Sequence, residues 1–495
     1  MPWSLHGYKV GASEQWFEEI PRDEDALDGF ITAARRAIEP WLSAVFQSEH
    51  LNLLLGSGFT AAVGHQTKAA ATGMGPVAFG SKYDDKIDAY AKKSATAMGR
   101  GSANIEDQLR GALMVLEGLK VIGDDADRRA LQDQMDAVLL NFLGSLLSTE
   151  RAIAEARDED WKSGVSALQS FLLSFASRAA SRERLHVFTT NYERLIEYGC
   201  DLAGLRIIDR FVGALNPVFR STRVDVDMHY NPPGIRGEPR FMEGVIRLTK
   251  LHGSLDWHIN ARTKQMHRVG IPFGAGISHS DVPKKPIETV MIYPNPAKDV
   301  ETTAYPYAEL FRDFAAALCR PNSVLVIYGY GFGDDHVNRV LLDMLSIPST
   351  HIVIIAFGTK AESSARARSF YNNAARPAQI SLLVGEHFAH LENLVTHYLP
   401  KPAIDFITSR MAELLKHRPS GTASGEDIGQ AASIGAEPVA QPAPTMLPST
   451  SSPPRGPSAS PFAATAQGAP SSPAPSASAT IPSPCPAQMS DDEPF

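Results

Sequence analysis

Residues 51–64 read LNLLLGSGFTAAVG, and this stretch restricts the fold that the rest of the chain can form. Its apolar run predicts a short buried strand, its glycines a tight turn, and the residues after them the start of a helix. Exposed N–H groups at a helix start attract phosphate, so Gly56 and Gly58 are candidates for close backbone approach to a nucleotide. Glycine also serves packing in such turns, and for this stretch alone both interpretations stay open.

The spacing of the glycines also fits the G-x-G-x-x-A fingerprint of dinucleotide-binding proteins. That fingerprint requires a second strand that ends in an acidic residue about 20 residues further on. Residues 66–85 read QTKAAATGMGPVAFGSKYDD, which is not a strand pattern. The sequence therefore disfavours an ordinary dehydrogenase, and we expect loop and irregular helix over residues 66–103.

Beyond this stretch, a segment with the apolar spacing of helices is followed by a segment with short apolar strands. Apolar residues recur every three or four positions across residues 104–178, with Asn104 placed as an N-cap, which predicts a helical lobe inserted between two strands. From residue 185 onward, short apolar strands alternate with helices, as in a parallel sheet covered on both faces. The predicted strands carry the sequences LHVFTTN, LRIIDRF, VIRLTKLHGS, VMIYP, SVLVIY, HIVIIAFG and QISLLVGE.

We therefore predict an α/β fold: a Rossmann-like parallel sheet with helices on both faces, an inserted helical lobe and a disordered C-terminal tail. The tail holds 16 of the 35 prolines and too few apolar residues to offset the entropy of ordering its backbone. The expected divisions are the N-terminal helices with the first strand and glycine loop (1–65), the lobe (66–180), the remainder of the sheet domain (181–415) and the Pro/Ser-rich tail (416–495).

Charge and cysteine content bound the function further. The formal net charge is −8, of which the residues from Pro419 onward carry −5, so the body is too balanced to indicate a nucleic-acid surface. The three cysteines, Cys200, Cys319 and Cys485, have no zinc-ligand spacing, which fits a reducing compartment. We see no signal-peptide pattern and no run of roughly 20 apolar residues, and we expect a soluble cytoplasmic protein.

Two polar motifs lie where predicted strands end. Asn191 stands in TTNYE (189–193), and His252 stands in KLHGS (250–254). Asparagine often caps a following helix, and a single histidine is more often structural than catalytic. Because ligands bind beyond the carboxyl ends of parallel strands, however, we expect both side chains at the same edge of the sheet, where chemistry takes place.

A third motif, GYGFGDDHVN (329–338), follows the apolar strand SVLVIY. Its three glycines in five residues predict a backbone that lies against a ligand, while a tight turn with Asp335 as the helix cap is the alternative. Asp334, Asp335 and His336 are metal-ligand residue types, but their spacing matches no metal motif.

Taken in order, GSGFT, TTNYE, KLHGS and GYGFGDDHVN resemble the motifs of the sirtuin (Sir2-type) family, in particular its bacterial antiphage-defence branch that lacks the zinc ribbon. The resemblance implies NAD as a substrate and Asn191 and His252 as the catalytic pair. It also implies that the first motif cradles the NAD phosphates and that the late glycine loop contacts the adenosine ribose. The NAD-binding residues that it implies are Gly56, Ser57, Gly58, Phe59, Thr60, Glu193, Gly329, Gly331 and Phe332.

The reaction that the resemblance implies is cleavage of the nicotinamide–ribose bond, to nicotinamide and ADP-ribose or a cyclised product. That bond breaks through an oxocarbenium-like state and releases a neutral leaving group, so positioned polar side chains suffice. Glu193 stands where the family usually has an aspartate near the nicotinamide carboxamide. The zinc-binding module of deacylating sirtuins is missing, so water is the expected acceptor and no metal is expected; this favours NAD hydrolysis over protein deacylation.

Because unrestrained loss of NAD would be toxic, the resemblance also implies regulation. The implied partners are a HerA-type ATPase, an Argonaute-like protein or further copies of this chain, with residues 104–178 as the candidate interface. The last residues, SDDEPF, resemble the tail of bacterial single-strand DNA-binding proteins, which suggests a DNA-repair partner held through Phe495. An accidental acidic end is the alternative, and no membrane is expected.

Two other functions stay open from the sequence. A non-catalytic sensor of NAD or ADP-ribose would bind through the same glycine loops without releasing nicotinamide. A zinc-free protein deacylase would need a groove for an acyl-lysine.

Overall fold

The chain divides into two units, residues 1–419 and 420–495. The predicted disorder of residues 416–495 lies outside the described part of the chain. The computed structural model describes residues 5–70, 75–97, 102–221, 226–230, 240–260, 262–288, 290–292, 306–358 and 362–402.

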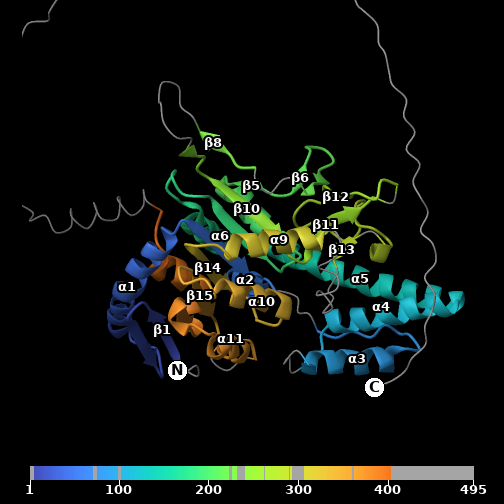
Figure 1. The fold of residues 1–495 in the computed structure, drawn as a ribbon, viewed down its shortest axis with the longest axis horizontal. Helices are drawn as coiled ribbons and strands as arrows, with labels where there is room; N and C mark the ends of the chain where they lie inside the picture. Colours follow the sequence, from blue (N-terminus) through green and yellow to red (C-terminus); the bar gives the residue numbers. More distant parts are fainter. Residues whose placement is uncertain are drawn as a thin grey trace, which may run out of the picture. The chain divides into compact units, whose positions relative to one another are not determined.

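A nine-stranded sheet lies at the centre of the first unit (Figure 1). Its seven strands from β16 to β5 are parallel, and β1 pairs antiparallel with both β16 and β2. In order across the sheet, the strands are β2 (Ser13–Phe17), β1 (His6–Val10), β16 (Ile380–Val384), β15 (His351–Ala356), β14 (Ser323–Tyr328), β3 (His50–Leu55), β4 (Leu185–Thr189), β10 (Val245–Lys250) and β5 (Arg206–Ile208).

The strand order confirms the Rossmann-like prediction. From β3 the chain proceeds to β4 and β10 on one side, then returns to β14 beside β3 and continues to β15 and β16 on the other. This is the 3-2-1-4-5-6 order of the doubly wound fold, with the reversal between β3 and β14. The hairpin β1–β2 was not predicted, because its five-residue strands include the polar run Ser13–Gln15 and show little apolar alternation.

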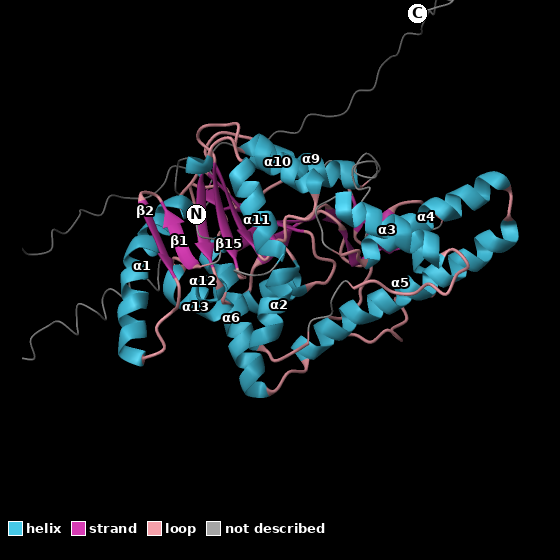
Figure 2. Ribbon diagram, turned by 90° about the horizontal axis from the view of Figure 1, so that it is seen from below, coloured by secondary structure: helices cyan, strands magenta, loops and turns pink. Residues whose placement is uncertain are grey.

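Helices cover both faces of the sheet, as Figure 2 shows. Alternate strand residues serve the two faces: Leu53 and Leu55 belong to one core cluster and Leu54 to the other. One face carries α1 (Glu24–Phe46), α2 (Ser57–Gln66), α6 (Asp158–Ala176), α7 (Leu195–Ala203), α12 (Glu386–Ala389), α13 (Leu391–Asn393) and η4 (Leu394–Tyr398). The other face carries α9 (Tyr307–Leu318), α10 (Asp335–Met344) and α11 (Glu362–Asn373).

The helical lobe consists of α3 (Asp84–Ala97), α4 (Ile105–Ile122) and α5 (Asp125–Ala154), which share a core of their own. Asn104 caps α4 as predicted, within a capping box that Asp107 completes. The expectation of loop and irregular helix over residues 66–103 is wrong for α3, a regular helix whose periodicity is weak because its buried side chains are mostly alanine. In contrast, α6 packs on the sheet, where the ring of Phe171 lies 5.5 Å from that of Tyr328 in β14.

A second sheet of short antiparallel strands continues from the carboxyl end of β10. The segment VMIYP, expected as a strand of the parallel sheet, instead contributes β13 to this second sheet, because it pairs antiparallel with β11. In order, its strands are β13 (Val290–Ile292), β11 (Gly253–Ile259), β12 (Met266–Arg268), β7 (Val218–Phe219) and β6 (Phe211–Val212). A separate two-stranded ribbon consists of β8 (His229–Tyr230) and β9 (Arg240–Phe241).

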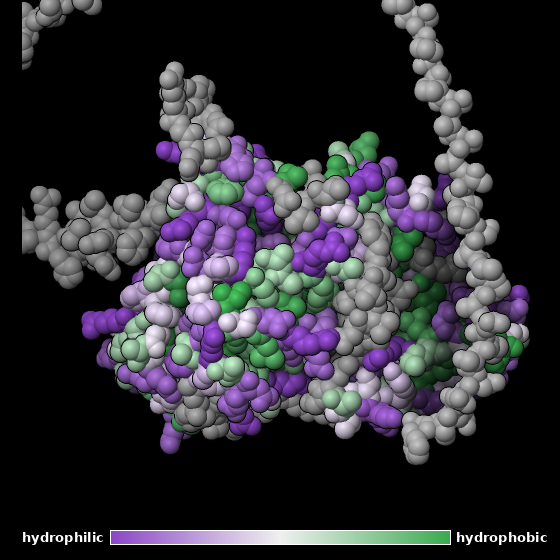
Figure 3. All heavy atoms as spheres, in the orientation of Figure 1, coloured by the Kyte–Doolittle hydropathy of each residue, from purple (hydrophilic) through white to green (hydrophobic). Residues whose placement is uncertain are grey.

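Apolar surface gathers on the lobe. On the face seen in Figure 3, hydrophobic residues cluster over the lobe helices at the right, and Val121 and Ile122 at the end of α4 are 84% and 74% exposed. Among the described helices, α5 alone has the length and composition of a membrane span. Its apolar residues Phe142 and Leu143 are nevertheless buried in the lobe core, as in the core helix of a folded domain.

Replacing Phe171 by Ala tests whether α6 belongs to the sheet core. Its ring is fully buried against Phe59 and Phe175, so we expect the free energy of unfolding to fall by about 3–5 kcal/mol in urea titrations. Val121→Ala, at the exposed end of α4, is the control and should change it by less than about 0.5 kcal/mol. Equal effects of the two substitutions would contradict the assignment.

Candidate functional site

The segments that follow β3, β4, β10 and β14 meet at the carboxyl edge of the sheet and enclose a cleft of about 280 Å³. Ligands bind at this edge in open parallel sheets, at the point where the strand order reverses. The fold thus brings together the four motifs selected from the sequence. The cleft is lined by Gly56, Ser57, Thr60, Asn104, Glu106, Leu146, Thr149, Thr190, Asn191, Tyr192, Glu193, His252, Tyr330, Gly331, Gly333, Asp334 and Arg366.

Four of the predicted site residues do not line the cleft. Phe59 is buried in the sheet core, and Phe332 packs against Phe370. Gly58 and Gly329 pack against each other and do not line the cleft. The predicted residues that do line it are Gly56, Ser57, Thr60, Asn191, Glu193, His252 and Gly331.

The glycines of the first and last motifs interlock. Gly56 N–H donates to the carbonyl of Tyr328 (3.2 Å), and Gly58 N–H donates to that of Gly329 (2.9 Å). Gly329 has a φ of +68°, and a Cβ atom there would lie 2.3 Å from the backbone nitrogen of Phe59. These glycines are therefore required for the close approach of the two loops. The N–H groups of Gly56 and Gly58 bond to backbone carbonyls within the protein.

Asn191 does not cap the next helix, which begins at Leu195. Its side chain turns back toward the glycine turn, where Nδ2 lies 3.0 Å from the Gly56 carbonyl, 3.1 Å from Thr60 Oγ1 and 3.0 Å from Glu193 Oε1. The Thr60 hydroxyl also donates to Glu193 Oε1. Asn191 is 6% exposed, so its amide is held in one orientation by a buried network.

His252 enters the cleft from the end of β10 and is 3% exposed. Its Nε2 lies 3.9 Å from Asp334 Oδ2, and its ring lies beside that of Tyr192, with centroids 6.2 Å apart. The preceding Lys250, also buried, donates to the Glu193 carbonyl (2.7 Å) and to Glu197 Oε1 (3.0 Å). Lys250 thereby ties the segment after β10 to the segment that carries Asn191.

The lobe contributes to the site, which the sequence did not indicate. Tyr192 Oη donates to Glu106 Oε1 of α4 (3.1 Å), and burial together with the charge of Glu106 raises the pKa of Tyr192 well above its usual range. Arg194 donates to both carboxylate oxygens of Glu150 of α5, at 3.1 and 2.5 Å. Burial lowers the pKa of Arg194, but its hydrogen bond with Glu150 and the charge of that residue outweigh this and raise it.

Asp334 and Arg366 are further cleft residues whose place the sequence did not show. Asp334, and not the predicted alternative Asp335, occupies the N-cap position of α10. The side chain of Asp334 makes no capping hydrogen bond. Arg366 Nε donates to the Gly331 carbonyl (2.7 Å) and holds that loop. Within the described ranges, no three His, Cys, Asp or Glu side chains are placed to hold a metal ion.

The geometry is that of a doubly wound α/β fold with polar side chains at the reversal of strand order. Residues 185–376 match the SIR2-like domain family. Over these residues the chain is similar to Sir2-type domains, and domains of this type use NAD. The match includes Asn191, His252 and the loop after β14, whereas β3 and its glycine turn precede it. A comparison with curated proteins finds no match.

Gly329→Ala tests the interlocked loops. Because the new Cβ would meet backbone atoms that cannot move independently, we expect a loss of at least about 2 kcal/mol in the free energy of unfolding. Gly331→Ala is the matched control: its nearest neighbour is the end of the flexible Arg366 side chain at 3.4 Å, so its stability should change little. Similar stability of the two variants in urea titrations would refute the requirement for glycine.

Proposed function

We propose that this chain is an NAD glycohydrolase, which cleaves the bond between nicotinamide and ribose C1′ with water as the acceptor. The observation that carries the proposal is the convergence of Asn191 and His252, from the ends of β4 and β10, on one cleft. Both side chains are buried, so a molecule bound there reacts in a largely water-free environment. The Sir2-type match supports NAD as the substrate.

Asn191 acts in this proposal through its amide oxygen. Its Nδ2 carries two hydrogens and faces three protein acceptors, so Oδ1 is the atom that the side chain offers to the cleft. A carbonyl oxygen accepts a hydrogen bond from a ribose hydroxyl or from the attacking water. Holding that group in place removes part of the entropic cost of reaching the transition state.

His252 acts as the general base. The water oxygen forms a bond with C1′, its proton passes to His252, and the C1′–N bond breaks with its electron pair going to the ring nitrogen of nicotinamide. Nicotinamide leaves as a neutral molecule, and the other product is ADP-ribose. The carboxylate of Asp334, 3.9 Å from Nε2, favours the imidazolium that forms when His252 takes the proton.

Glu193 has a positioning role in this scheme. Its Oε1 accepts from both Asn191 and Thr60, so it fixes the orientation of the Asn191 amide. The extra methylene relative to aspartate lets the carboxylate reach the glycine turn. Contact of Glu193 with the nicotinamide carboxamide, implied by the resemblance, stays part of the proposal.

In the cell, we place this activity in a regulated, NAD-depleting effector of bacterial antiphage defence that acts in the cytoplasm. The ordered motifs support that branch, and a HerA-type ATPase, an Argonaute-like protein or further copies of the chain are the proposed regulators. The hydrogen bonds of Glu106 and Glu150 with the Asn191 segment support regulation through the lobe. The proposed DNA-repair contact through Phe495 falls outside the described residues.

Nicotinamide release from NAD by the purified protein is the direct test. We expect release by the unaltered chain, alone or with its regulator, and a decrease of at least about 100-fold in Asn191→Ala and His252→Ala. His279→Ala, a partly exposed histidine outside the cleft, should keep full activity.

The same assay separates the rival functions. NAD binding without nicotinamide release under any condition would point to a sensor. Release that requires an acyl-lysine peptide would point to a deacylase.

Asp334→Asn tests the role of the carboxylate beside His252. The amide keeps the shape but loses the charge, so we expect kcat to fall about 10-fold or more with KM within a factor of about three. Asp335→Asn, one residue further on, is the control and should keep its kcat. An unchanged kcat in Asp334→Asn would remove this residue from the mechanism.

A further inference from the structure

A second cavity, of about 400 Å³, lies on the α9 side of the sheet and shares no lining residue with the cleft. From the sheet it is lined by Leu51 and Asn52 of β3, His186 of β4, Ile208 of β5 and residues 247–249 of β10. Asn52, His186 and Arg247, neighbours in register across these strands, form its floor. Covered faces of parallel sheets are usually apolar. A polar row at this place therefore requires a partner for its hydrogen-bonding groups.

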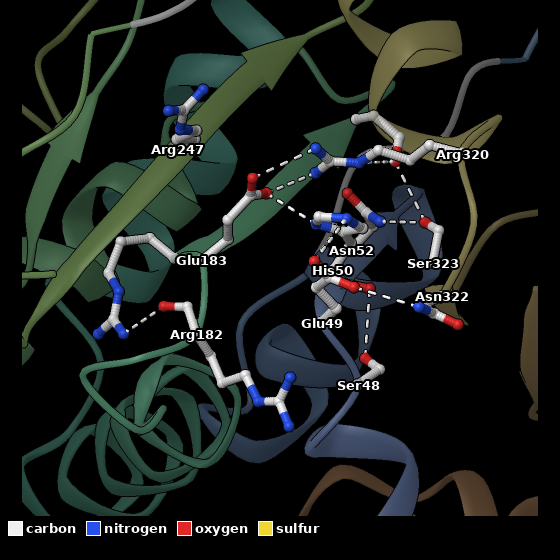
Figure 4. Close-up of polar contacts among 12 residues, drawn as sticks. Ser48, Glu49, His50, Asn52, Arg182, Glu183, Arg247, Arg320, Asn322 and Ser323 are labelled. Atoms are coloured by element: carbon white, nitrogen blue, oxygen red, sulfur yellow. Dashed lines mark hydrogen bonds and ion pairs between the residues drawn. The ribbon is translucent and has the colours of Figure 1, made fainter. Parts of the chain in front are cut away.

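Ion pairs form the walls of this polar cavity. Figure 4 shows Glu183 between Arg320, which donates to its two oxygens at 2.6 and 3.3 Å, and His50, whose Nδ1 lies 3.0 Å away. Arg247 donates to Asp227 at 3.0 Å. Four arginines and four carboxylates line the cavity in all. Donors and acceptors therefore stand side by side, and the wall has no net charge.

Two polar atoms of the wall are buried without a partner among the described residues: Asn52 Oδ1 and Arg184 Nε. Asn52 is 1% exposed, and its Nδ2 is fixed by Ser323 Oγ (3.0 Å) and the Val324 carbonyl (3.2 Å). Both atoms are enclosed by the protein, so one acceptor and one donor remain unsatisfied at a cost in free energy.

An uncharged imidazole and an aromatic ring complete the cavity. Burial, reinforced by Arg247, Arg320 and Arg210, holds the pKa of His186 well below its usual range. Its Nε2 pairs with Thr249 Oγ1 at 2.9 Å, so at most one ring nitrogen is left for a ligand. At the rim, the Phe241 ring lies 4.7 Å from that of His229. The cavity thus combines paired hydrogen-bonding groups with the rings of Phe241 and His229, whose planes are tilted by 34° to each other.

We propose that the polar cavity binds an uncharged ribonucleoside, whose vicinal hydroxyls meet the Arg247–Asp227 pair. Each hydroxyl both donates and accepts, so a vicinal diol donates to a carboxylate while it accepts from the adjacent guanidinium. The rings at the rim suit the face of a nucleobase. A phosphate group is not favoured, because the wall has no net charge and its guanidinium groups at Arg210, Arg247 and Arg320 already pair with carboxylates. The volume lies within the usual range of small-molecule sites.

Calorimetric titration of the full chain with adenosine tests this site. We expect one adenosine per chain and binding weaker by at least about 10-fold for 2′,3′-dideoxyadenosine and for AMP. Arg247→Met should weaken adenosine binding to a similar extent, and Asn191→Ala, in the other cleft, should leave it unchanged. The comparison of adenosine with the other two ligands uses the unaltered chain, so it tests recognition of the diol even if Arg247→Met does not fold.

Three outcomes would overturn the proposal. If millimolar adenosine produces no heat of binding and no increase in the melting temperature, adenosine is not a ligand of the cavity. Equal affinity for the dideoxy compound, or higher affinity for AMP or inorganic phosphate, would exclude recognition of the diol. Binding lost in Asn191→Ala but kept in Arg247→Met would place adenosine in the cleft. None of these results depends on whether the chain cleaves NAD.

Discussion

The backbone contact between the loops after β3 and β14 is the constraint on which the site depends. The two strands are paired in register along their whole length, from His50 with Ser323 to Leu55 with Tyr328, so their loops leave the sheet at the same level. Only residues without a side chain fit at Gly56, Gly58 and Gly329. That contact sets where α2 begins, and the first turn of α2 carries Thr60, which holds the network around Asn191.

The sequence alone predicted those features that depend on local pattern. Strand periodicity and the glycine turn predicted the parallel sheet, and the position of Asn191 and His252 after apolar strands predicted that they would converge. The purpose of the glycines was harder to predict, because glycine suits close approach to a ligand and close approach to another loop equally well. Gly56 lines the cleft, whereas Gly58 and Gly329 pack against each other.

The features that sequence reasoning missed depend on contacts between distant segments. Glu106 and Thr149 reach the cleft because the lobe folds back against the sheet edge, and no periodicity within α4 or α5 shows where those helices end in space. Asn52 and His186 stand in largely apolar strands. They line one cavity with Arg247 because the register places Asn52 beside His186 and His186 beside Arg247. A single polar residue within an apolar strand can therefore indicate a buried polar cavity, which the apolar pattern alone does not show.

The buried pair of Arg194 and Glu150 joins the Asn191 segment to a helix that begins far out in the lobe. Removing either partner alone would leave an uncompensated buried charge, which typically costs about 3–5 kcal/mol. A substitution of Arg194 therefore requires a compensating change at Glu150 of the lobe. A lobe taken from another protein would leave this site intact only if it supplied a carboxylate for Arg194.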